Sequence, residues 1–351
     1  MRLGLILANS CAADDIALAR RAEAAGFHSV YAYDFFASNA IARLGGIAAA
    51  TSRVRIGSAI ANTFTRSPMV LAQGALDIDD ISGGRLILGI GSQIKPHIEK
   101  RYSMPWGKPA ARMREYVMAL KAIWACWYEG VPLDFRGEFY THTLMTPMFT
   151  PADKRYGAPP VYVAAVGPLM SENAAEVADG VMLHAFTTEE YVRTVTLPAI
   201  DKGLAKAGRT RSSLQIIGTP FLVTGETQEQ FDKVKLAARN QIAFYASTPA
   251  YRGVLESIGY GELQGELNQL SKAGEWVEMG RRVMEFLNEE ARNASEKLAE
   301  GRGVFPEWAE SVWGPEDTCA RDPDGNRIRP ERRLRNCNIT TVAPTGTISI
   351  F

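Results

Sequence analysis

The sequence predicts an α/β fold, a TIM-type (β/α)8 barrel that is incomplete at its eighth unit and carries an irregular and helical C-terminal segment. Up to about residue 279, short apolar runs alternate with longer helical stretches, which is typical of repeated βα units around a parallel sheet. Beyond residue 279 the charged fraction rises from about 20% (55 of 279 residues) to about 32% (23 of 72). We therefore expect a barrel over residues 1–279 and a distinct segment over residues 280–351.

Seven apolar runs are predicted to form the strands. Each is short and continuous, as in strands that are buried on both faces. They cover residues 3–8, 29–33, 55–61, 86–90, 161–165, 180–183 and 214–223. Helical stretches separate several of them, at residues 16–25, 68–81 and 113–127. A closed barrel of this type needs an eighth strand and helix, for which residues 1–279 offer no further pattern.

Two connections carry local signals of their own. Ser67 offers an N-cap hydroxyl directly before Pro68, and Gly83 and Gly84 suit the left-handed end of the same helix. Residues 132–160 are rich in Pro, Gly, Phe and Tyr and show little periodicity. A long irregular insertion in a barrel is either a functional lid or the cover of a barrel end, and the sequence leaves both open.

Composition excludes several classes of function. Lys and Arg number 39, as do Asp and Glu, so no surplus of positive charge is available for a nucleic-acid backbone. The apolar runs are too short for a membrane helix, and the 4 Cys are widely spaced without a paired metal or redox pattern. We expect a cytoplasmic protein with free thiols and no metal. Its expected partners are a small-molecule substrate and, as one candidate assembly, a second copy in a homodimer.

The residues at the predicted strand ends indicate how the chemistry is done. In a parallel barrel the active site lies at the C-terminal ends of the strands. The polar or turn-forming residues there include Asp34, Asn62, Ser92, Gln93, Gly167, Pro168 and His184. They contain no catalytic pair of carboxylates, no Ser/His/Asp set and no metal-ligand spacing. A site with so few titratable groups suits a cofactor that carries the chemistry while the protein binds and orients it.

Several motifs of residues 1–279 occur together. They are Gly26-Phe27-His28-Ser29-Val30-Tyr31, Thr65-Arg66-Ser67-Pro68, Ser82-Gly83-Gly84-Arg85 followed by an apolar run to Gly91, and Gly167-Pro168. In this combination the chain resembles the luciferase-like monooxygenase superfamily, in its branch of deazaflavin-dependent oxidoreductases. The stretch 91–99 with Met104-Pro105-Trp106 is similar to a narrower subgroup expected to use coenzyme F420.

The resemblance implies a hydride transfer between F420 and a small organic substrate, with an FMN-dependent monooxygenase as the alternative on the same fold. It also implies site residues. A non-proline cis peptide is expected at Ser58-Ala59, behind the cofactor ring, and Ser92 and Gln93 are expected to contact the cofactor. Asp34 and Asn62 are further cofactor-binding candidates.

The phosphate of the cofactor has its own expected site. Gly167, Pro168 and Leu169 precede or open a helix, and the N–H groups of its first turn could hold a phosphate.

The catalytic residue departs from the pattern of this branch. Characterised deazaflavin enzymes often have Asp-His at the end of the second strand, where this chain has Asp34-Phe35. His97 and His184 are the candidate substitutes by position. The alternatives are a structural role for His184 and a surface turn for His97.

Residues 280–351 carry motifs of a different kind from those of residues 1–279. Residues 280–299 have apolar side chains at helical spacing. Stretches 291–308 and 333–349, the latter with Thr340-Thr341-Val342-Ala343-Pro344-Thr345-Gly346-Thr347, resemble a fragment of class II adenosylcobalamin-dependent ribonucleotide reductase. That resemblance implies a phosphate-binding loop at residues 344–347. The radical-site Asn-x-Cys-x-Glu motif is absent from this segment, so we expect no ribonucleotide reduction.

The composite leaves two questions open. Residues 339–342 could supply a substitute eighth strand, or the barrel could stay open beside the first strand with exposed strand edges. An inactive fusion or a nucleotide-binding remnant of a ribonucleotide reductase is the third candidate function, beside the F420 and FMN enzymes.

Overall fold

The computed structural model describes residues 2–8, 11–34, 38–335 and 348–349. The chain divides into two compact units, Met1–Thr219 and Pro220–Phe351, and each is described by itself. The change in composition at residue 280 lies inside the second unit, within a helix that runs over Trp276–Arg302.

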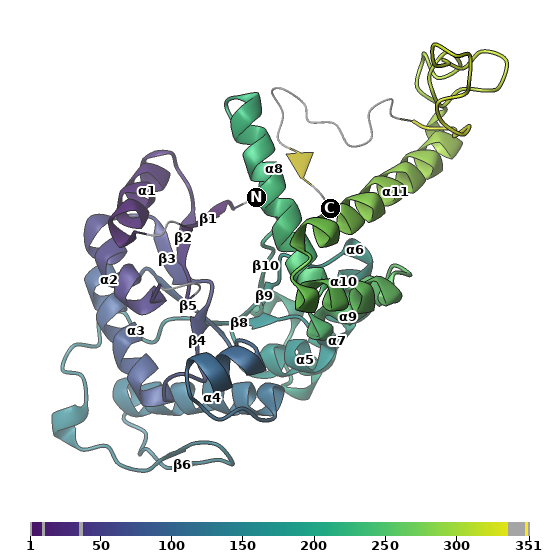
Figure 1. Cartoon of the computed structure of the whole chain (residues 1–351). Helices are drawn as coiled ribbons and strands as arrows, with labels where there is room; N and C mark the ends of the chain where they lie inside the picture. Colours follow the sequence, from purple (N-terminus) through teal and green to yellow (C-terminus); the bar gives the residue numbers. More distant parts are fainter. Residues whose placement is uncertain (1, 9–10, 35–37, 336–347, 350–351) are drawn as a thin grey trace. The chain divides into compact units, whose positions relative to one another are not determined.

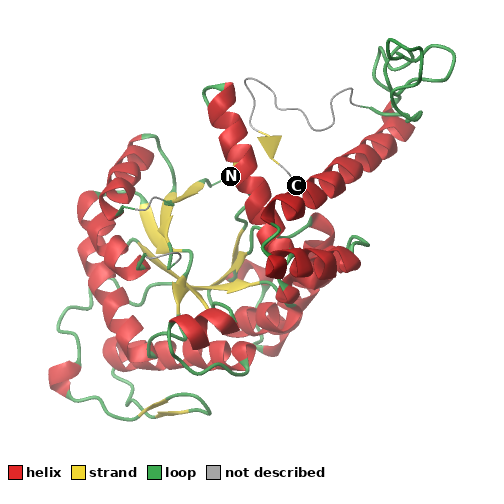
Figure 2. Ribbon diagram, viewed as in Figure 1, coloured by secondary structure: helices red, strands yellow, loops and turns green. Residues whose placement is uncertain are grey.

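A curled parallel sheet forms the centre of the first unit, with helices on its convex side (Figures 1 and 2). The strand order is β1 (Gly4–Ile6), β2 (Ser29–Ala32), β3 (Arg55–Ser58), β5 (Leu86–Gly91), β8 (Val161–Ala165), β9 (Gly180–Leu183) and β10 (Gln215–Ile217), and β4 (Ala61–Asn62) pairs with the end of β5. The longer helices are α1 (Ala12–Ala24), α2 (Ala40–Ala50), α3 (Pro68–Ser82), α4 (Pro109–Trp124), α5 (Pro168–Val177) and α7 (Leu197–Lys206).

Shorter helical turns complete the first unit. They are η1 (His97–Arg101), η2 (Ala125–Glu129), η3 (Pro147–Phe149), α6 (Glu189–Tyr191), η4 (Val192–Thr196) and η5 (Arg211–Ser213). Of these, η1, η2 and η4 are π-helical, and residues 92–96 connect β5 to η1.

The predicted incomplete barrel is confirmed. All seven predicted runs contain a strand, although the run at 55–61 divides into β3 and β4, and the run at 214–223 divides into β10 and the short β11 (Leu222–Val223). Within the described ranges, no strand pairs with the outer edge of β1 or of β10, so the parallel sheet is a half-barrel. The candidate eighth strand at 339–342 lies outside the described residues.

Side chains on the two faces of the sheet pack in separate clusters. Residues such as Val30 and Leu88 are fully buried against the helices. The alternate residues Tyr31 and Tyr162 pack with Ile87 and Met182 on the inner face. Gly57 and Gly180 make room for the two tyrosine rings, because a Cβ at either glycine would lie within 2.8 Å of a ring carbon.

The Ser82-Gly83-Gly84-Arg85 motif has a structural role. Gly83 and Gly84 both have a left-handed backbone, with φ of 73° and 80°, and they end α3. The Arg85 guanidinium then donates hydrogen bonds to the carbonyl oxygens of Ala48, Thr51 and Val54, at 3.1, 2.8 and 2.7 Å. Arg85 therefore joins the end of α2 and the entry to β3 to the start of β5.

The insertion at 132–160 covers helices on the outside of the unit. It contains the hairpin strands β6 (Phe135–Arg136) and β7 (Thr141–His142). The Glu115 carboxylate on α4 accepts hydrogen bonds from the N–H groups of Glu138, Phe139 and Tyr140, at 2.9, 2.7 and 2.7 Å. Arg155 lies 3.3 Å from Asp80 on α3. The insertion therefore packs along the outer sides of α3 and α4.

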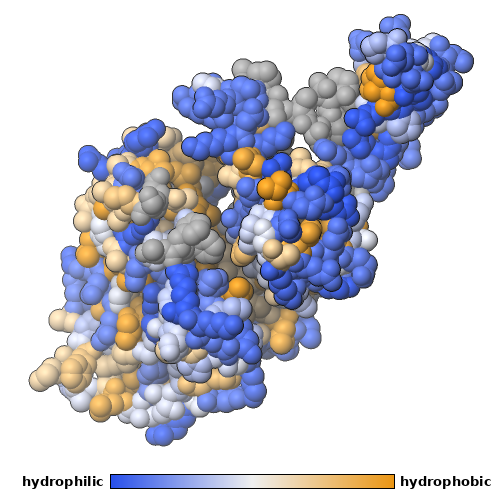
Figure 3. All heavy atoms as spheres, viewed as in Figure 1, coloured by the Kyte–Doolittle hydropathy of each residue, from blue (hydrophilic) through white to orange (hydrophobic). Residues whose placement is uncertain are grey.

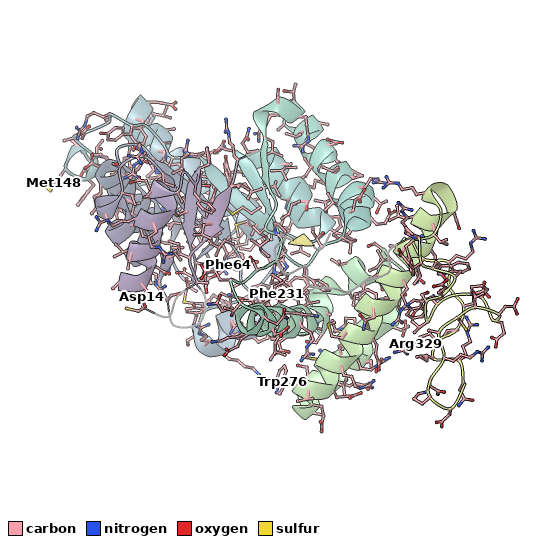
Figure 4. The ribbon with its side chains drawn as sticks, turned by 90° about the horizontal axis from the view of Figure 1, so that it is seen from above. Asp14, Phe64, Met148, Phe231, Trp276 and Arg329 are labelled. Carbon is pink, nitrogen blue, oxygen red and sulfur yellow. The ribbon has the colours of Figure 1, made fainter. Side chains whose placement is uncertain are left out.

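The outer end of this insertion is apolar and exposed. Leu144, Met148 and Phe149 are 76%, 86% and 63% exposed, and orange atoms are visible at the lower left of the space-filling view in Figure 3. In Figure 4, Met148 lies well away from Phe64, which belongs to the same unit and follows the end of β4.

The second unit is largely helical. It contains α8 (Gln228–Ala246), η6 (Pro249–Tyr251), α9 (Arg252–Glu256), α10 (Gly261–Ala273) and α11 (Trp276–Arg302), and β11 pairs antiparallel with β12 (Ile348–Ser349). The helix predicted at 280–299 is confirmed as part of α11. Residues 303–335 are mostly irregular and are tied to α11 by ion pairs such as Arg332 with Glu289, at 2.7 Å. In the described part of the chain, no helix combines the length and apolarity needed to cross a bilayer.

Candidate active site

The predicted site residues gather at one edge of the half-barrel. Asp34 follows β2, Asn62 ends β4, and Ser92 and Gln93 follow β5. Gly167 and His184 follow β8 and β9 on the same, C-terminal edge of the parallel sheet. This edge is where parallel α/β sheets place their ligands.

Asp34 holds neighbouring groups in place. The side chain is 4% exposed. Its Oδ1 accepts a hydrogen bond from the first N–H of α2, at Ala40 (2.6 Å), and its Oδ2 accepts one from the Asn62 N–H (2.8 Å). The same Oδ2 lies 3.0 Å from Nη2 of Arg66. Both carboxylate oxygens are thus engaged, so Asp34 acts on the site by positioning Asn62 and Arg66.

Asn62 and Arg66 each present a buried polar atom without a partner in the described structure. Asn62 is fully buried, and its Nδ2 donates to the Asp34 carbonyl and to the Tyr102 hydroxyl, both at 3.3 Å. Among the described residues, its Oδ1 accepts no hydrogen bond and Nη1 of Arg66 donates none. Buried polar atoms are almost always satisfied in proteins, so this acceptor and donor mark a place for water or for a polar group of a ligand.

The end of β3 carries a non-proline cis peptide bond, but not at the predicted position. The predicted cis peptide at Ser58-Ala59 is wrong by one residue, because the cis bond joins Ala59 and Ile60. The Ser58-Ala59 peptide still belongs to the sheet, where the Ala59 N–H donates to the Ala32 carbonyl at 2.8 Å. The Ser58 hydroxyl is also engaged, since it donates to the Gly89 carbonyl at 2.7 Å. Ser58 therefore links β3 to β5.

A small apolar floor lies beside these residues. Ala59, Ile60 and Ala164 pack against the inner-face cluster of the sheet. A Cβ at Gly91 would lie 2.7 Å from Cδ1 of Ile60 and 3.6 Å from Cβ of Ala164. Only a residue without a side chain leaves this floor flat. A planar ring could rest on it with its polar edge toward Asn62 and Arg66.

Two turns border the floor. Ser92 and Gln93 form the first, in which the Ser92 hydroxyl donates to the Gln93 carbonyl at 3.0 Å. Gln93 has a φ of 60°, a left-handed conformation that costs on the order of 1 kcal/mol outside glycine and that clusters at functional sites.

The second turn opens α5. Gly167 is its N-cap, Pro168 is its first residue, and Leu169 is 60% exposed. The first N–H groups of any helix lack intrahelical partners, and here the first bond recorded runs from the Ser171 N–H to the Gly167 carbonyl (3.0 Å). The start of α5 can therefore bind an anion through Leu169 and Met170 N–H groups.

The two candidate catalytic histidines come from different strand ends. His184 is half-buried, and its Nδ1 accepts a hydrogen bond from the Phe186 N–H at 3.0 Å. Burial lowers the pKa of His184 to about 4, so the ring is neutral at pH 7 and carries its proton on Nε2. His97 is the first residue of η1 and is also half-buried.

The sequence missed two participants of this site. Tyr102, which contacts Asn62, lies just beyond η1, and no local pattern distinguishes it. The sequence showed Arg66 only as part of a motif. Its position could have indicated the site, because Arg66 directly precedes the N-cap Ser67 of α3 and so lies in the connection that follows a strand end.

Comparison with known proteins places the chain. The profile of the family described as "Luciferase-like monooxygenase" matches residues 7–296. The chain belongs to the luciferase-like monooxygenase family. The match runs into the segment 280–351, and the comparisons give no support for its resemblance to ribonucleotide reductase. Residues 340–347, which contain most of that motif, lie outside the described structure.

Relatives of this luciferase-like chain include the F420-dependent glucose-6-phosphate dehydrogenase of Intrasporangium calvum, which is 29% identical over 73% of this chain and 78% of its own. An uncharacterised protein of Mycobacterium tuberculosis is 52% identical over 230 residues, or 66% of this chain and 68% of that protein. The 5,10-methylenetetrahydromethanopterin reductase of Archaeoglobus fulgidus is 31% identical, over 75% of this chain and 76% of its own.

Solved structures agree on the fold. The coenzyme F420-dependent tetrahydromethanopterin reductase of Methanopyrus kandleri superposes with a TM-score of 0.65 at 23% identity, over 80% of this chain and 82% of that one. An FMN complex of the oxygenating constituent of 3,6-diketocamphane monooxygenase, from Pseudomonas putida, has a TM-score of 0.53 at 16% identity, over 70% and 78%.

Proposed function

We propose that this protein is an oxidoreductase that transfers a hydride between F420 and a small organic substrate. The observation that carries the proposal is the flat floor of Ile60, Gly91 and Ala164 beside the unpartnered atoms of Asn62 and Arg66. This combination suits a planar heterocycle with one apolar face and a hydrogen-bonding edge. The F420-dependent glucose-6-phosphate dehydrogenase at 29% identity supports the choice of cofactor.

Each group of this chain then has a defined task. Asn62 Oδ1 accepts from a ring N–H, and Arg66 Nη1 donates to a ring carbonyl, while Asp34 fixes both residues. Ser92 and Gln93 border the ring, and the first turn of α5, from Gly167 to Leu169, holds the phosphate. When bound, F420 supplies the hydride chemistry at its C5 position.

The proton that accompanies hydride transfer needs a donor or acceptor. We propose His184 for this role, because its neutral ring carries a proton on Nε2 at neutral pH. His97, on η1, is the second candidate.

An FMN-dependent monooxygenase is the alternative cofactor choice. It is favoured by structural neighbours that bind FMN, such as the diketocamphane enzyme. Oxygen consumption with reduced FMN distinguishes it from the F420 enzyme.

We further propose cytoplasmic action on a small molecule, with neither nucleic acid nor membrane as a partner, and assembly as a homodimer. The exposed apolar side chains of Leu144, Met148 and Phe149 support the homodimer, because such groups on one loop mark association surfaces. Light scattering on the purified chain tests the assembly.

The floor provides a sharp test of the proposed function. Ala164→Leu places a larger side chain on the floor and is expected to weaken F420 binding by roughly tenfold or more, because a planar ring no longer fits. Ala164→Ser is the matched control and is expected to bind as the parent does. F420 fluorescence measures both affinities, and circular dichroism confirms that both variants fold. Equal F420 affinity in all three proteins contradicts the proposed placement.

A further inference from the structure

We infer that residues 95–102, between β5 and α4, form an anion-binding element at the mouth of the site, with a phosphate or carboxylate group as ligand. The inference rests on the proposed function for the location of the mouth. It adds a recognition element, and thus a chemical class of ligand, that the proposed function does not specify.

The element concentrates positive charge that the protein does not neutralise. Lys100 and Arg101 are exposed and, in the described ranges, belong to no ion pair. His97 lies on the same short helix and can add a third donor. The single carboxylate of the helix, Glu99, faces Lys95 at 3.9 Å. Most other arginines of the chain are committed to carboxylates or carbonyls, as Arg66 and Arg85 are.

A chain of contacts connects this charge to the buried part of the site. The Arg101 guanidinium carbon lies 5.1 Å from the centroid of the Tyr102 ring. The Tyr102 hydroxyl accepts a hydrogen bond from Asn62 Nδ2 at 3.3 Å, and Asn62 carries the unpartnered Oδ1. Arg101 is therefore separated from the ligand-facing residues of the floor by one aromatic ring.

The backbone holds the element in a defined conformation. Ile98 is fully buried and anchors η1 in the core while its neighbours stay exposed. The Tyr102 N–H closes η1 onto the His97 carbonyl at 2.9 Å. Gln93 and Ser103, on either side of the element, both have left-handed φ, at 60° and 55°. Non-glycine residues in this conformation and π-helical turns are both concentrated at functional sites.

The chemistry of these groups defines the ligand. A guanidinium binds carboxylate and phosphate oxygens through paired N–H donors, and a neighbouring ammonium adds charge. The anion has two candidate sources, an acid group on the substrate or an acid group on the cofactor tail beyond the phosphate that the first turn of α5 holds. The two sources share one binding chemistry and differ in which molecule carries it.

The test compares two charge-matched double variants of the full chain. Lys100→Ala/Arg101→Ala removes the proposed donors. Arg20→Ala/Arg211→Ala removes two exposed arginines elsewhere that have no ion pair within the described residues. Calorimetry with inorganic pyrophosphate measures anion binding, and fluorescence measures the affinity for F420 and for the same deazaflavin without its tail.

We expect saturable pyrophosphate binding that falls by roughly tenfold or more in Lys100→Ala/Arg101→Ala and by less than about twofold in the control. Lys100→Arg/Arg101→Lys, which keeps both charges, is expected to retain most of the binding. If Lys100→Ala/Arg101→Ala also lowers the affinity for F420 but leaves the affinity for the tail-less deazaflavin unchanged, the anion is on the cofactor tail. If this variant changes neither deazaflavin affinity, the anion belongs to the substrate.

Equal pyrophosphate binding in both double variants, or no saturable binding in the parent protein, overturns the inference. If pyrophosphate binds through Lys100 and Arg101 but neither deazaflavin binds the parent chain, the proposed function fails and the anion-binding element stands.

Discussion

Asp34 is the residue on which the geometry of the site depends most. Its carboxylate joins the start of α2, the end of β4 and Arg66, and it is nearly inaccessible to water. The sequence placed Asp34 at a strand end but could not show that its oxygens are already occupied. That information is in the contacts among three segments that are separated in the chain.

Asp34→Asn is expected to lower the free energy of unfolding by about 2 kcal/mol, because it leaves the half-buried Arg66 without its carboxylate. Urea unfolding of the full chain measures the change. Asp77→Asn, at an exposed aspartate on α3, is the control and is expected to change stability by less than about 0.5 kcal/mol. Similar stability of the two variants would show that the Asp34 network contributes little.

His184 gives a prediction about pH. Burial lowers its pKa from 6.5 to about 4 in the folded protein. Between these values the unfolded chain binds a proton that the folded chain does not, so this residue makes stability fall as pH falls from 6.5 to about 4. His184→Gln is expected to remove that part of the pH dependence. The measurement compares the free energy of unfolding of the parent chain and of the variant as a function of pH. An NMR titration of the His184 imidazole with a midpoint near 6.5 would contradict the lowered pKa.

Among the elements, the strands were the easiest to predict. The runs at 161–165 and 180–183 coincide with β8 and β9, because strands covered on both faces must be apolar throughout. The hairpin β6–β7 was not predicted. Its pairing depends on Glu115 of α4, which binds three N–H groups in its turn. A structure held by a distant carboxylate leaves no periodic pattern in its own residues.

Local sequence patterns also failed to locate the cis peptide and the short helix η1. The resemblance placed the cis bond at Ser58-Ala59, whereas the cis bond joins Ala59 and Ile60. The sequence indicated His97 only as a single candidate. In the structure, His97 belongs to the short helix η1, which also contains Lys100 and Arg101.

Arg85 ties three elements together and gives a prediction at this scale. Arg85→Lys keeps the charge but cannot reach Ala48, Thr51 and Val54 together, so we expect a loss of about 2 kcal/mol in unfolding free energy. Hydrogen exchange is expected to rise at the end of α2 and the start of β3. Arg53→Lys, at a neighbouring exposed arginine, is the control. Unchanged exchange in Arg85→Lys would contradict the role of this motif as a structural junction.

For the whole molecule, composition and structure divide the chain at different places. The charged fraction changes at residue 280, while the compact units meet between Thr219 and Pro220. The family match continues to residue 296. Charge density reports how a surface is solvated, and it does not report which residues pack together. The division into residues 1–279 and 280–351 that the composition indicates stays a prediction.

The central claim is that the first unit of this luciferase-like protein binds a deazaflavin on its strand-end floor. Parallel titrations of the full chain with F420 and with FMN, followed by fluorescence, test it most directly. We predict saturable binding of F420 and at least about tenfold weaker binding of FMN, a difference of roughly 1.4 kcal/mol. Saturable FMN binding without F420 binding, or no binding of either, would contradict the claim.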